Sequence, residues 1–406
     1  MNNGHMKAVS EFVHKLFVDK QFDCLTVSFG CKQVNGSYTD EKSIRIGVRE
    51  KLNKGDIPPG KLVPKTITVD GITYQTDVFV APPMTASMAM PIACNSPEPS
   101  INSLPTNDSA FRPLIGGTSL TTDATPGVGT LGGMVIDNYD GTIAGLTNNH
   151  VAVPNAPGTP YHRLPMFQVS DPLYGAKFAQ YGTIPCYQGG GFIGNVKRRI
   201  PFRSYNTCDV ALINLNTAIC STGSWQQRGS PFTAPPPFAS TSEINSLNAN
   251  VPIFVCGRTT GPKGGFDSAC QIRVTDIYQS VAVDYGTIAN PNLVSFYNTL
   301  SFSSPVTNSI VSWGGDSGAF LYAFLSGAWK LVGINFAASN SITFGSFGTA
   351  ARIDEVAAAL NVVAYQGSAI PVNAAAPSYV DVDYYANLAN DAITHLGKTY
   401  WVAGRL

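Results

Sequence analysis

The eight residues WGGDSGAF, Trp313–Phe320, are the segment that most restricts the fold of this chain. They place three glycines, an aspartate and a serine between two apolar stretches, SIVSW and LYAFL, which have the composition of buried strands. A tight hairpin turn explains such a segment, because glycine and aspartate adopt backbone angles that other residues avoid. A catalytic loop explains it equally well, so the rest of the chain has to decide between the two interpretations.

Composition favours a protein of many short strands and turns. Glycine (39) and proline (28) are abundant among the 406 residues, apolar residues make up 44%, and charged residues make up only 13%, about half the usual share. A chain of this length can hold two or three domains with a sizeable core. The formal net charge of +0 gives no reason to expect nucleic acid or an anionic membrane surface as a partner.

Shifts in composition divide the chain into six segments. A helix with one apolar side, followed by β-branched strand segments, predicts a small α/β unit at the N-terminus. Two stretches rich in Ser, Pro and Asn or Thr have the composition of linkers. The six segments are the N-terminal unit (1–83), a linker (84–110), a strand-rich region (111–220), a second linker (221–250), a second strand-rich region that ends in a helix (251–362) and a polar, alanine-rich tail (363–406).

Three short patterns give local predictions. Asp140 and Gly141 between apolar segments predict a hairpin turn. The sequence ARIDEVAAALNV, residues 351–362, has the apolar spacing of a helix. The basic run KRR, residues 197–199, is interpreted as a solvated face, since a nucleic-acid site would need more positive charge around it.

The sequence predicts a cytoplasmic protein that needs no cofactor and no metal. No apolar run approaches the roughly 20 residues of a membrane span, and the N-terminus lacks the continuous apolar stretch of a signal peptide. We therefore expect the eight cysteines to be reduced for the most part, with Cys256 and Cys270 as the first pair to suspect of a disulfide. Neither the cysteines nor the five histidines have metal-ligand spacing.

Three residues far apart in the sequence supply the groups that serine-based hydrolysis requires. Such a reaction needs a hydroxyl nucleophile, a base that removes its proton and an acid that orients the base. His150 lies in LTNNHVAV, Asp209 in CDVALINL and Ser317 in GGDSGAF, each next to an apolar strand segment. Alone, each has an ordinary structural explanation, such as a hydrogen-bonded core histidine or an aspartate that caps a strand. Their joint occurrence in this order favours a catalytic set.

These contexts resemble the histidine, aspartate and serine motifs of the chymotrypsin-like (trypsin-like) serine peptidases. Further stretches are similar to a non-secreted bacterial and plant branch of that clan, which includes the NARROW LEAF protein. They include RPLIGG (112–117), GTLGGMVID (129–137), GRTTG (257–261), LVGINF (331–336) and IDEVAAAL (353–360). The resemblance covers roughly residues 20–362.

The resemblance implies a mainly β fold with two perpendicular six-stranded barrels and the active site between them. The first barrel, 111–220, would carry the histidine and the aspartate, and the second, 251–362, would carry the serine. Ser317 would then be the nucleophile, His150 the general base and acid, and Asp209 the group that orients the imidazole. The backbone N–H groups of Gly315 and Ser317 would form the oxyanion hole.

The resemblance also implies a substrate pocket. It raises the question of whether the protein is activated by cleavage, and which group then pairs with Asp316. Val311 would form the base of the pocket, where it cannot pair with a cation, so tryptic specificity is not expected. Trp313, which stands where secreted members carry a cysteine, would also line the pocket. Phe336, Ala337 and Ala338 would form the opposite wall, where the alanines, in place of family glycines, would narrow the pocket. RPLIGG is similar to a zymogen activation sequence, but Pro113 disfavours tryptic cleavage there. The carboxylate of Asp316 therefore needs a partner other than a freed N-terminus, and GRTTG is either an ordinary turn or a segment whose Arg258 contacts substrate or Asp316.

The function that these features favour is that of a serine endopeptidase acting on protein or peptide substrates, with narrow or self-directed specificity. A regulated protease, whose N-terminal unit binds a ligand or subunit, is a variant of this hypothesis. The alternative is a structural or scaffold protein of the virion type that keeps the protease fold, in which case the chain would be virion-associated. We also expect a homo-oligomer, because the apolar strands of the N-terminal unit and the tyrosine-rich tail need a surface to cover them. The alternative is a monomer in which the N-terminal unit packs on the barrels of its own chain.

Overall fold

The computed structural model describes residues 3–20, 22–34, 36–86, 115–122, 125–152, 177–179, 192–200, 202, 204–215, 230–232, 234–266, 271–286, 291–305, 310–341, 345–365 and 367. Most of the predicted tail, most of the predicted first linker and part of RPLIGG lie outside these residues. Cys94, Cys186, Cys220 and Cys270 do as well.

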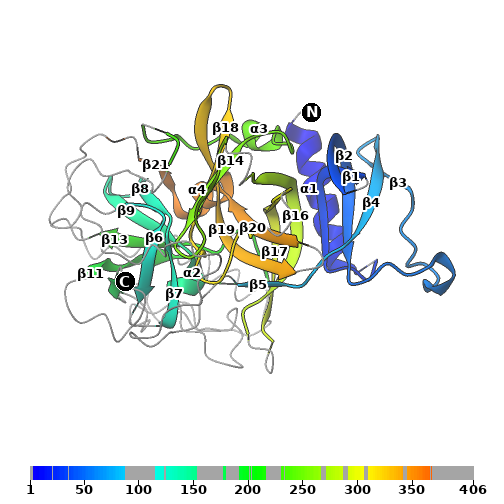
Figure 1. The fold of residues 1–406 in the computed structure, drawn as a ribbon, viewed down its shortest axis with the longest axis horizontal. Coiled ribbons are helices and arrows are strands. Elements are labelled where there is room, and N and C mark those ends of the chain that lie inside the picture. The colour runs from blue at the N-terminus through cyan, green and yellow to red at the C-terminus, as the bar shows by residue number, and fades with distance from the viewer. Residues whose placement is uncertain are drawn as a thin grey trace, which may run out of the picture.

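The described residues form a mainly β protein in which the strands make two sheets, one of 13 strands and one of eight (Figure 1). A helix opens the chain, and another follows the last long strand of the larger sheet. This confirms the predicted fold class. Both sheets have more than the six strands expected of each barrel; the N-terminal strands extend the larger sheet, and a C-terminal strand joins the smaller one. Within the described residues, no helix combines the length and the apolar character that crossing a bilayer requires.

The N-terminal unit extends the larger sheet instead of forming a separate one. Strand β1 pairs antiparallel with β16, so the sheet continues from the second half of the chain into β1, β2, β4 and β3. The predicted helix and strands of this unit are confirmed, and the predicted linker 84–110 begins with a short strand, β5. The elements are α1 (Asn3–Val18), β1 (Thr26–Val34), β2 (Ser37–Val48), the 3-10 turn η1 (Lys54–Asp56), β3 (Thr66–Val69), β4 (Ile72–Val80) and β5 (Met84–Ala86).

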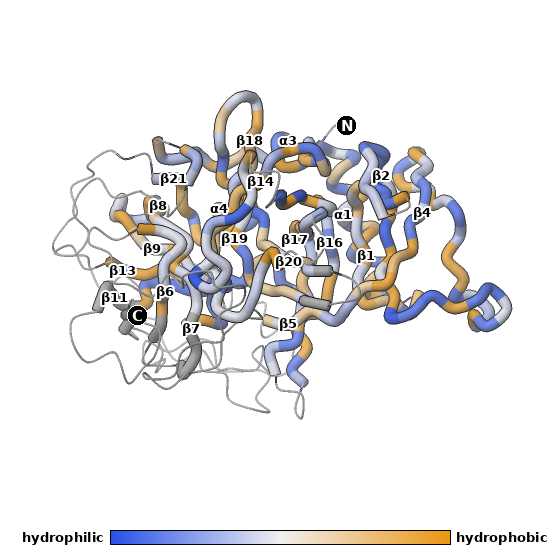
Figure 2. The backbone as a smooth tube through the Cα atoms, viewed as in Figure 1, coloured by the Kyte–Doolittle hydropathy of each residue, from blue (hydrophilic) through white to orange (hydrophobic). Residues whose placement is uncertain are grey.

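The apolar side of α1 is covered by the chain itself. Met6, Val9, Val13 and Leu16 are buried, and the helix packs against β1, β16 and β17. The connection from β2 to β3, which projects from the body of the molecule, is largely hydrophilic (Figure 2). The apolar side of α1 therefore needs no second copy of the chain to cover it. The homo-oligomer itself stays a prediction.

The smaller sheet holds the first strand-rich region, in the order β21-β8-β9-β13-β11-β10-β6-β7. Its β8–β9 hairpin turns at Asp140 and Gly141, as the sequence predicts. Leu120, Leu131 and Ile213 lie in its separate apolar core. Its elements are β6 (Thr118–Thr122), β7 (Thr125–Leu131), β8 (Gly133–Asp137), β9 (Ile143–Thr147), α2 (Asn149–Ala152), β10 (Lys177–Ala179), β11 (Phe192–Arg199) and β13 (Ala211–Leu215).

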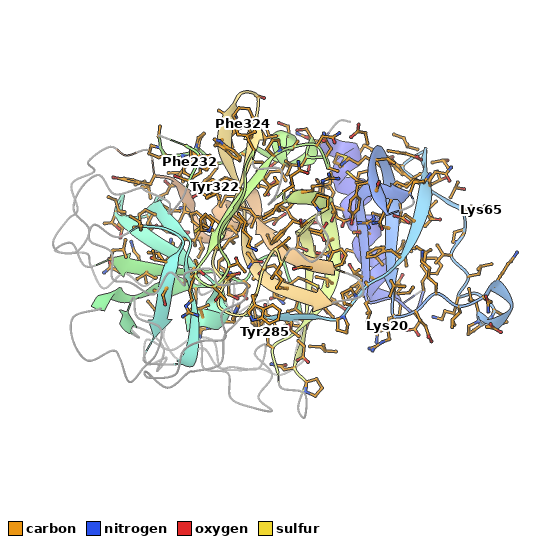
Figure 3. All side chains as sticks on the ribbon, viewed as in Figure 1. Lys20, Lys65, Phe232, Tyr285, Tyr322 and Phe324 are labelled. Atoms are coloured by element: carbon orange, nitrogen blue, oxygen red, sulfur yellow. The ribbon has the colours of Figure 1, made fainter. Side chains whose placement is uncertain are left out.

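The larger sheet holds the second strand-rich region and most of the apolar core. Several aromatic rings pack together beside β18, where the Phe232 and Tyr322 ring centroids lie 4.7 Å apart (Figure 3). A helix with a Ser240 capping box, α3, lies in the predicted second linker. The elements are β12 (Tyr205–Asn206), α3 (Thr241–Asn245), β14 (Ile253–Gly257), β15 (Gly261–Gly264), β16 (Arg273–Asp284), β17 (Leu293–Ser303), β18 (Phe320–Leu325), β19 (Ala328–Ser341) and β20 (Gly345–Arg352).

The predicted C-terminal helix is α4 (Ile353–Leu360), and it is followed by β21 (Val362–Ala364), which returns to pair with β8. The KRR run lies at the end of β11, and its three side chains are buried. The prediction that this run forms a solvated face is therefore wrong. Arg198 is 1% exposed and makes two hydrogen bonds to Asp137, each 2.9 Å, and a third to the Leu360 carbonyl at 2.6 Å. Lys197 is also buried and reaches Asp140 at 2.6 Å. These charges can be buried because aspartates of the β8–β9 hairpin pair with them.

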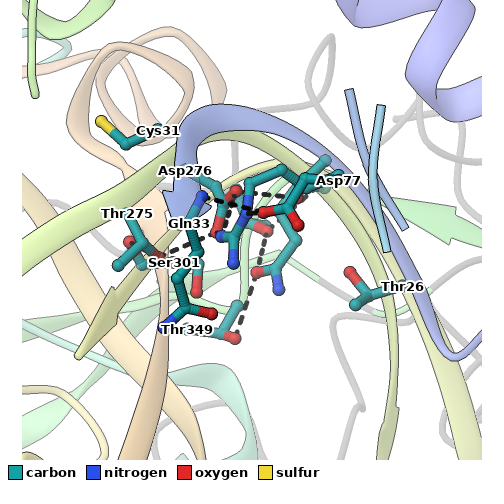
Figure 4. Close-up of polar contacts among 12 residues, drawn as sticks. Thr26, Cys31, Gln33, Asp77, Thr275, Asp276, Ser301 and Thr349 are labelled. Carbon is teal, nitrogen blue, oxygen red and sulfur yellow. Dashed lines mark hydrogen bonds and ion pairs between the residues drawn. The ribbon is translucent and has the colours of Figure 1, made fainter. Parts of the chain in front are cut away.

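A buried ion cluster joins the N-terminal unit to β16 (Figure 4). The Arg45 guanidinium, which is 1% exposed, lies 2.8 Å from both carboxylate oxygens of Asp276 on β16 and 3.2 Å from Asp77 on β4. Its cation also lies 4.3 Å from the centre of the Phe79 ring. Two aspartates from different parts of the sequence therefore share one arginine, which fixes how the unit sits on the sheet.

Candidate active site

The structure brings together the three residues that the sequence proposes as a catalytic set. His150 lies in the short helix α2 directly after β9, and Asp209 lies two residues before β13, both in the smaller sheet. Ser317 lies in the turn that precedes β18 in the larger sheet. All three are buried, with none of their surface exposed.

Hydrogen bonds connect these side chains in a single line. The Nε2 atom of His150 lies 2.8 Å from the Ser317 hydroxyl oxygen, and Nδ1 of the same ring is hydrogen-bonded to Oδ2 of Asp209. The other carboxylate oxygen of Asp209 accepts the backbone N–H of His150 at 3.0 Å. Asp209 thus fixes both the ring and the backbone of His150, which leaves Nε2 directed at the serine.

Two further residues hold Asp209, and sequence reasoning missed both. The Tyr285 hydroxyl donates to Oδ2 of Asp209 at 2.8 Å, and the Tyr285 ring lies edge-on to His150 with centroids 5.3 Å apart. Tyr285 directly follows β16 and is labelled in Figure 3. Asn148 donates its amide to the Asp209 carbonyl at 2.6 Å. Asn148 stands inside the histidine motif TNNHV and offered a signal, whereas Tyr285 lies in no motif.

The serine turn has a backbone that requires glycine at two positions. Gly315 has a φ of +97° and Gly318 a φ of +99°, both in the left-handed region that side chains disfavour. A Cβ atom at Gly318 would lie 2.1 Å from the Thr130 carbonyl oxygen, and one at Gly315 would lie 2.4 Å from the Thr259 hydroxyl. The glycines of the WGGDSGAF segment therefore allow the turn to approach both β7 and the GRTTG segment.

Asp316 has its partners in the turn and in the GRTTG segment. Its carboxylate accepts the backbone N–H groups of Thr259 at 2.8 Å, Thr260 at 3.1 Å and Trp313 at 3.0 Å. Burial raises the pKa of the Asp316 carboxyl above its ordinary value, although the bonds from Thr260, Thr259 and Trp313 act in the opposite direction. These three backbone amides are the partners that the sequence analysis required for Asp316, and they hold the turn. Arg258 is buried beside them.

Two threonine hydroxyls fix the peptide groups around Gly315. The Thr259 hydroxyl donates to the Gly314 carbonyl at 2.7 Å, and the Thr130 hydroxyl donates to the Gly315 carbonyl at 2.8 Å. The Thr130 N–H also donates to the Ser317 carbonyl at 2.7 Å. Among the described residues, no hydrogen bond engages the N–H of Gly315 or of Ser317. Both N–H groups can therefore donate to an oxygen of a bound molecule.

The predicted pocket residues differ in exposure. Val311, Phe336 and Ala337 belong to the buried core, and the Phe336 ring packs on Phe296 with centroids 4.6 Å apart. Trp313 is 37% exposed. The Phe336 carbonyl oxygen lies 3.5 Å from the Ser317 hydroxyl, which places this segment of β19 beside the serine. Their role in a substrate pocket stays a prediction.

The other polar groups of the described residues form no metal site. No group of three or more His, Cys, Asp or Glu side chains within these residues is arranged to hold a metal ion. Cys24, Cys31, Cys208 and Cys256 carry thiols in the structure, and the three of them other than Cys24 are buried.

Comparison with known proteins gives similarity to solved structures only. No family model matches the sequence, and no curated protein matches it. A glutamic-acid-specific serine protease that uses a histidine triad in substrate binding aligns with 62% of this chain and 100% of its own, at 16% identity and a TM-score of 0.39. The Nocardiopsis protease NAPase aligns with 62% and 98%, at 15% identity and a TM-score of 0.39. Cellulomonas bogoriensis chymotrypsin aligns with 62% of this chain and 98% of its own, at 14% identity and a TM-score of 0.33.

Similarity at this level concerns the fold and says nothing about activity or substrate. None of these comparisons supports the narrower bacterial and plant branch of the clan, which stays a prediction.

Proposed function

We propose that this protein is a serine endopeptidase with Ser317 as its nucleophile. The observation that carries the proposal is the line of hydrogen bonds from Asp209 through His150 to Ser317, beside two backbone N–H groups that bind nothing else among the described residues. A structural serine would need neither a histidine oriented by an acid nor unused donors at its side.

In this mechanism each residue has one task. His150 removes the Ser317 proton through Nε2 as the hydroxyl oxygen attacks the substrate carbonyl, and it later gives that proton to the departing amine. Asp209 holds the imidazole in the tautomer that presents Nε2 and stabilises the imidazolium. The N–H groups of Gly315 and Ser317 donate to the oxygen that becomes negative in the tetrahedral intermediate. A water molecule then hydrolyses the acyl-serine by the same steps in reverse.

The finer specificity that we propose is for small or medium apolar side chains at the position before the cleaved bond. Val311 carries no charge with which to bind Lys or Arg, and an unpaired buried cation is costly. Alanines stand at positions 337 and 338, where the resemblance expects glycines, and their methyl groups would narrow the site.

A fluorophosphonate probe tests the proposal directly, because it phosphonylates a serine only when a base activates it. We expect the probe to label the wild-type protein at Ser317 and to leave Ser317→Ala unlabelled, with Ser37→Ala, an exposed serine, as the matched control. Absence of label on a folded wild-type protein would favour the scaffold alternative.

A further inference from the structure

Asn335 on β19 is hydrogen-bonded to the serine turn on both sides of Ser317. Its side-chain amide donates to the carbonyl oxygen of Asp316 at 3.0 Å, and its backbone carbonyl accepts the N–H of Gly318 at 2.8 Å. Its own backbone N–H donates to the Ala319 carbonyl at 2.8 Å. One residue of β19 therefore contacts the peptide groups before and after the nucleophile.

The side-chain bond to Asp316 bears on the direction of the Ser317 N–H. The Asp316 carbonyl and the Ser317 N–H belong to one peptide group, and in a trans peptide these two bonds point in opposite directions. An amide that holds the carbonyl from one side therefore directs the N–H away from Asn335. Among the described residues this N–H has no hydrogen-bond partner, so its direction is set only through the carbonyl.

The orientation of the Asn335 amide follows from its partners. A carbonyl oxygen can only accept, so the group that faces Asp316 is the NH2 group. This NH2 group also donates to the Ser312 hydroxyl oxygen at 2.9 Å. Both amide hydrogens are thus used, whereas the side-chain oxygen Oδ1 has no hydrogen-bond partner, although none of the residue is exposed.

Folding alone does not favour an asparagine at this position. A buried acceptor without a partner costs stability, and such a group calls for a specific explanation. The Asp316 carbonyl does not depend on the amide for a partner, because the N–H of Ala319 also donates to it at 3.0 Å. What the Asn335 amide adds is a second constraint on the peptide group that carries the N–H of the nucleophile.

We propose that Asn335 is a positioning residue that holds the Ser317 N–H in the direction of the substrate oxygen. This inference rests on the proposed function. As the Ser317 oxygen bonds to the substrate carbonyl carbon, the carbonyl oxygen becomes negative, and an N–H that already points at it stabilises this charge without rearrangement. Asn335 itself touches neither the substrate nor the reacting atoms.

Two substitutions separate this hydrogen bond from packing. Asn335→Leu has nearly the same side-chain shape without the N–H groups, whereas Asn335→Ala removes these groups and leaves a space. We expect both variants to lower kcat on a peptide substrate by about tenfold, less than the roughly 10²–10³ for losing a donor outright, because Ala319 still holds the Asp316 carbonyl. KM should change little, because the bond acts on charge that develops in the transition state.

Affinity for a peptide aldehyde is the second readout, because its adduct with Ser317 places an oxygen where the tetrahedral intermediate has one. We expect this affinity to fall in proportion to kcat in both variants. Asn214→Ala, at a half-buried asparagine on β13, is the control and should keep the wild-type kcat. Urea unfolding checks that each variant is folded.

A packing role gives a different pattern. Asn335→Leu would then keep the wild-type kcat and aldehyde affinity, and only Asn335→Ala would lose them, which would overturn the inference. If Asn335→Leu does not fold, Asn335→Ala decides by the same readouts. A wild-type kcat in that variant, or a loss confined to KM, would overturn the inference as well.

The fluorophosphonate probe distinguishes two kinds of failure. A wild-type protein that is labelled at Ser317, together with Asn335 variants that are as active as the wild type, overturns the role of Asn335 and leaves the proposed function in place. A folded wild-type protein that is neither labelled nor active overturns the proposed function, and the role of Asn335 with it.

Discussion

The Tyr285 hydroxyl donates to the same carboxylate oxygen of Asp209 that accepts the hydrogen bond of the His150 ring. A residue from the larger sheet thus helps to orient an acid and a base that belong to the smaller sheet. Because the residues are buried, the two sheets must keep their relative position for the line of hydrogen bonds to form.

We predict that Tyr285→Phe lowers kcat/KM by about tenfold, since a hydrogen bond to a charged group is worth about 1.5–3 kcal/mol and only part of this acts in the transition state. Tyr278→Phe is a matched control, because Tyr278 is also buried and its hydroxyl bonds to Asn245. Steady-state kinetics on a peptide substrate measures both. Equal activity of Tyr285→Phe and the wild-type protein would show that Tyr285 acts only in packing.

A second prediction concerns the dependence of Ser317 and His150 on one another. Alanine at either position should abolish measurable peptidase activity, and the double variant should be little worse than each single one, because the two side chains act as a unit. Rates on a sensitive fluorogenic peptide measure this. Effects that multiply in the double variant would mean that the two residues work independently.

The sequence predicted the site where its signals are local. His150, Asp209 and Ser317 each stand in a short motif beside a strand, and the glycines of the serine turn mark an unusual backbone. Tyr285 and Asn335 contribute through contacts between distant segments, for which a single sequence has no signal. The KRR run was misread for the same reason, since the partners of Arg198 lie in β8 and at the end of α4.

A third prediction assigns Thr259 as a positioning residue for the oxyanion donor. Its hydroxyl holds the Gly314 carbonyl, and in a trans peptide the Gly315 N–H points the opposite way. We expect Thr259→Val to lower kcat by about tenfold, less than the roughly 10²–10³ for losing a donor outright, because the N–H is misplaced and not removed, with KM little changed. Affinity for a peptide aldehyde, which forms a tetrahedral adduct, should fall in parallel. Thr259→Ser should restore both, and failure of this rescue would point to a packing effect.

The fourth prediction concerns the pH dependence of stability at Asp354. Burial would raise the pKa of this carboxyl, but its hydrogen bonds with Arg352, 3.0 and 2.7 Å long, bring it below the ordinary value of 3.8. The unfolded chain therefore takes up the proton at a higher pH than the folded chain, so this stabilisation is present above about pH 4 and is lost as the pH falls through the folded pKa.

Asp354→Asn should accordingly lower the free energy of unfolding at pH 7 by about 3 kcal/mol, because Arg352 is left buried without its charge partner. The difference from the wild-type protein should shrink as the pH falls below 3.8. Urea unfolding at several pH values measures it, with the exposed Asp19→Asn as the control. A difference that stays constant with pH would show that the carboxylate charge is not the cause.

The last prediction concerns the ion cluster that attaches the N-terminal unit. Arg45→Met leaves the Asp276 carboxylate buried with no guanidinium beside it, and breaking a buried pair from one side costs about 3–5 kcal/mol. Adding Asp276→Asn removes the stranded charge, so the double variant should be less destabilised than the sum of the two single variants. Urea unfolding of the four proteins measures the coupling, and additive effects would contradict it.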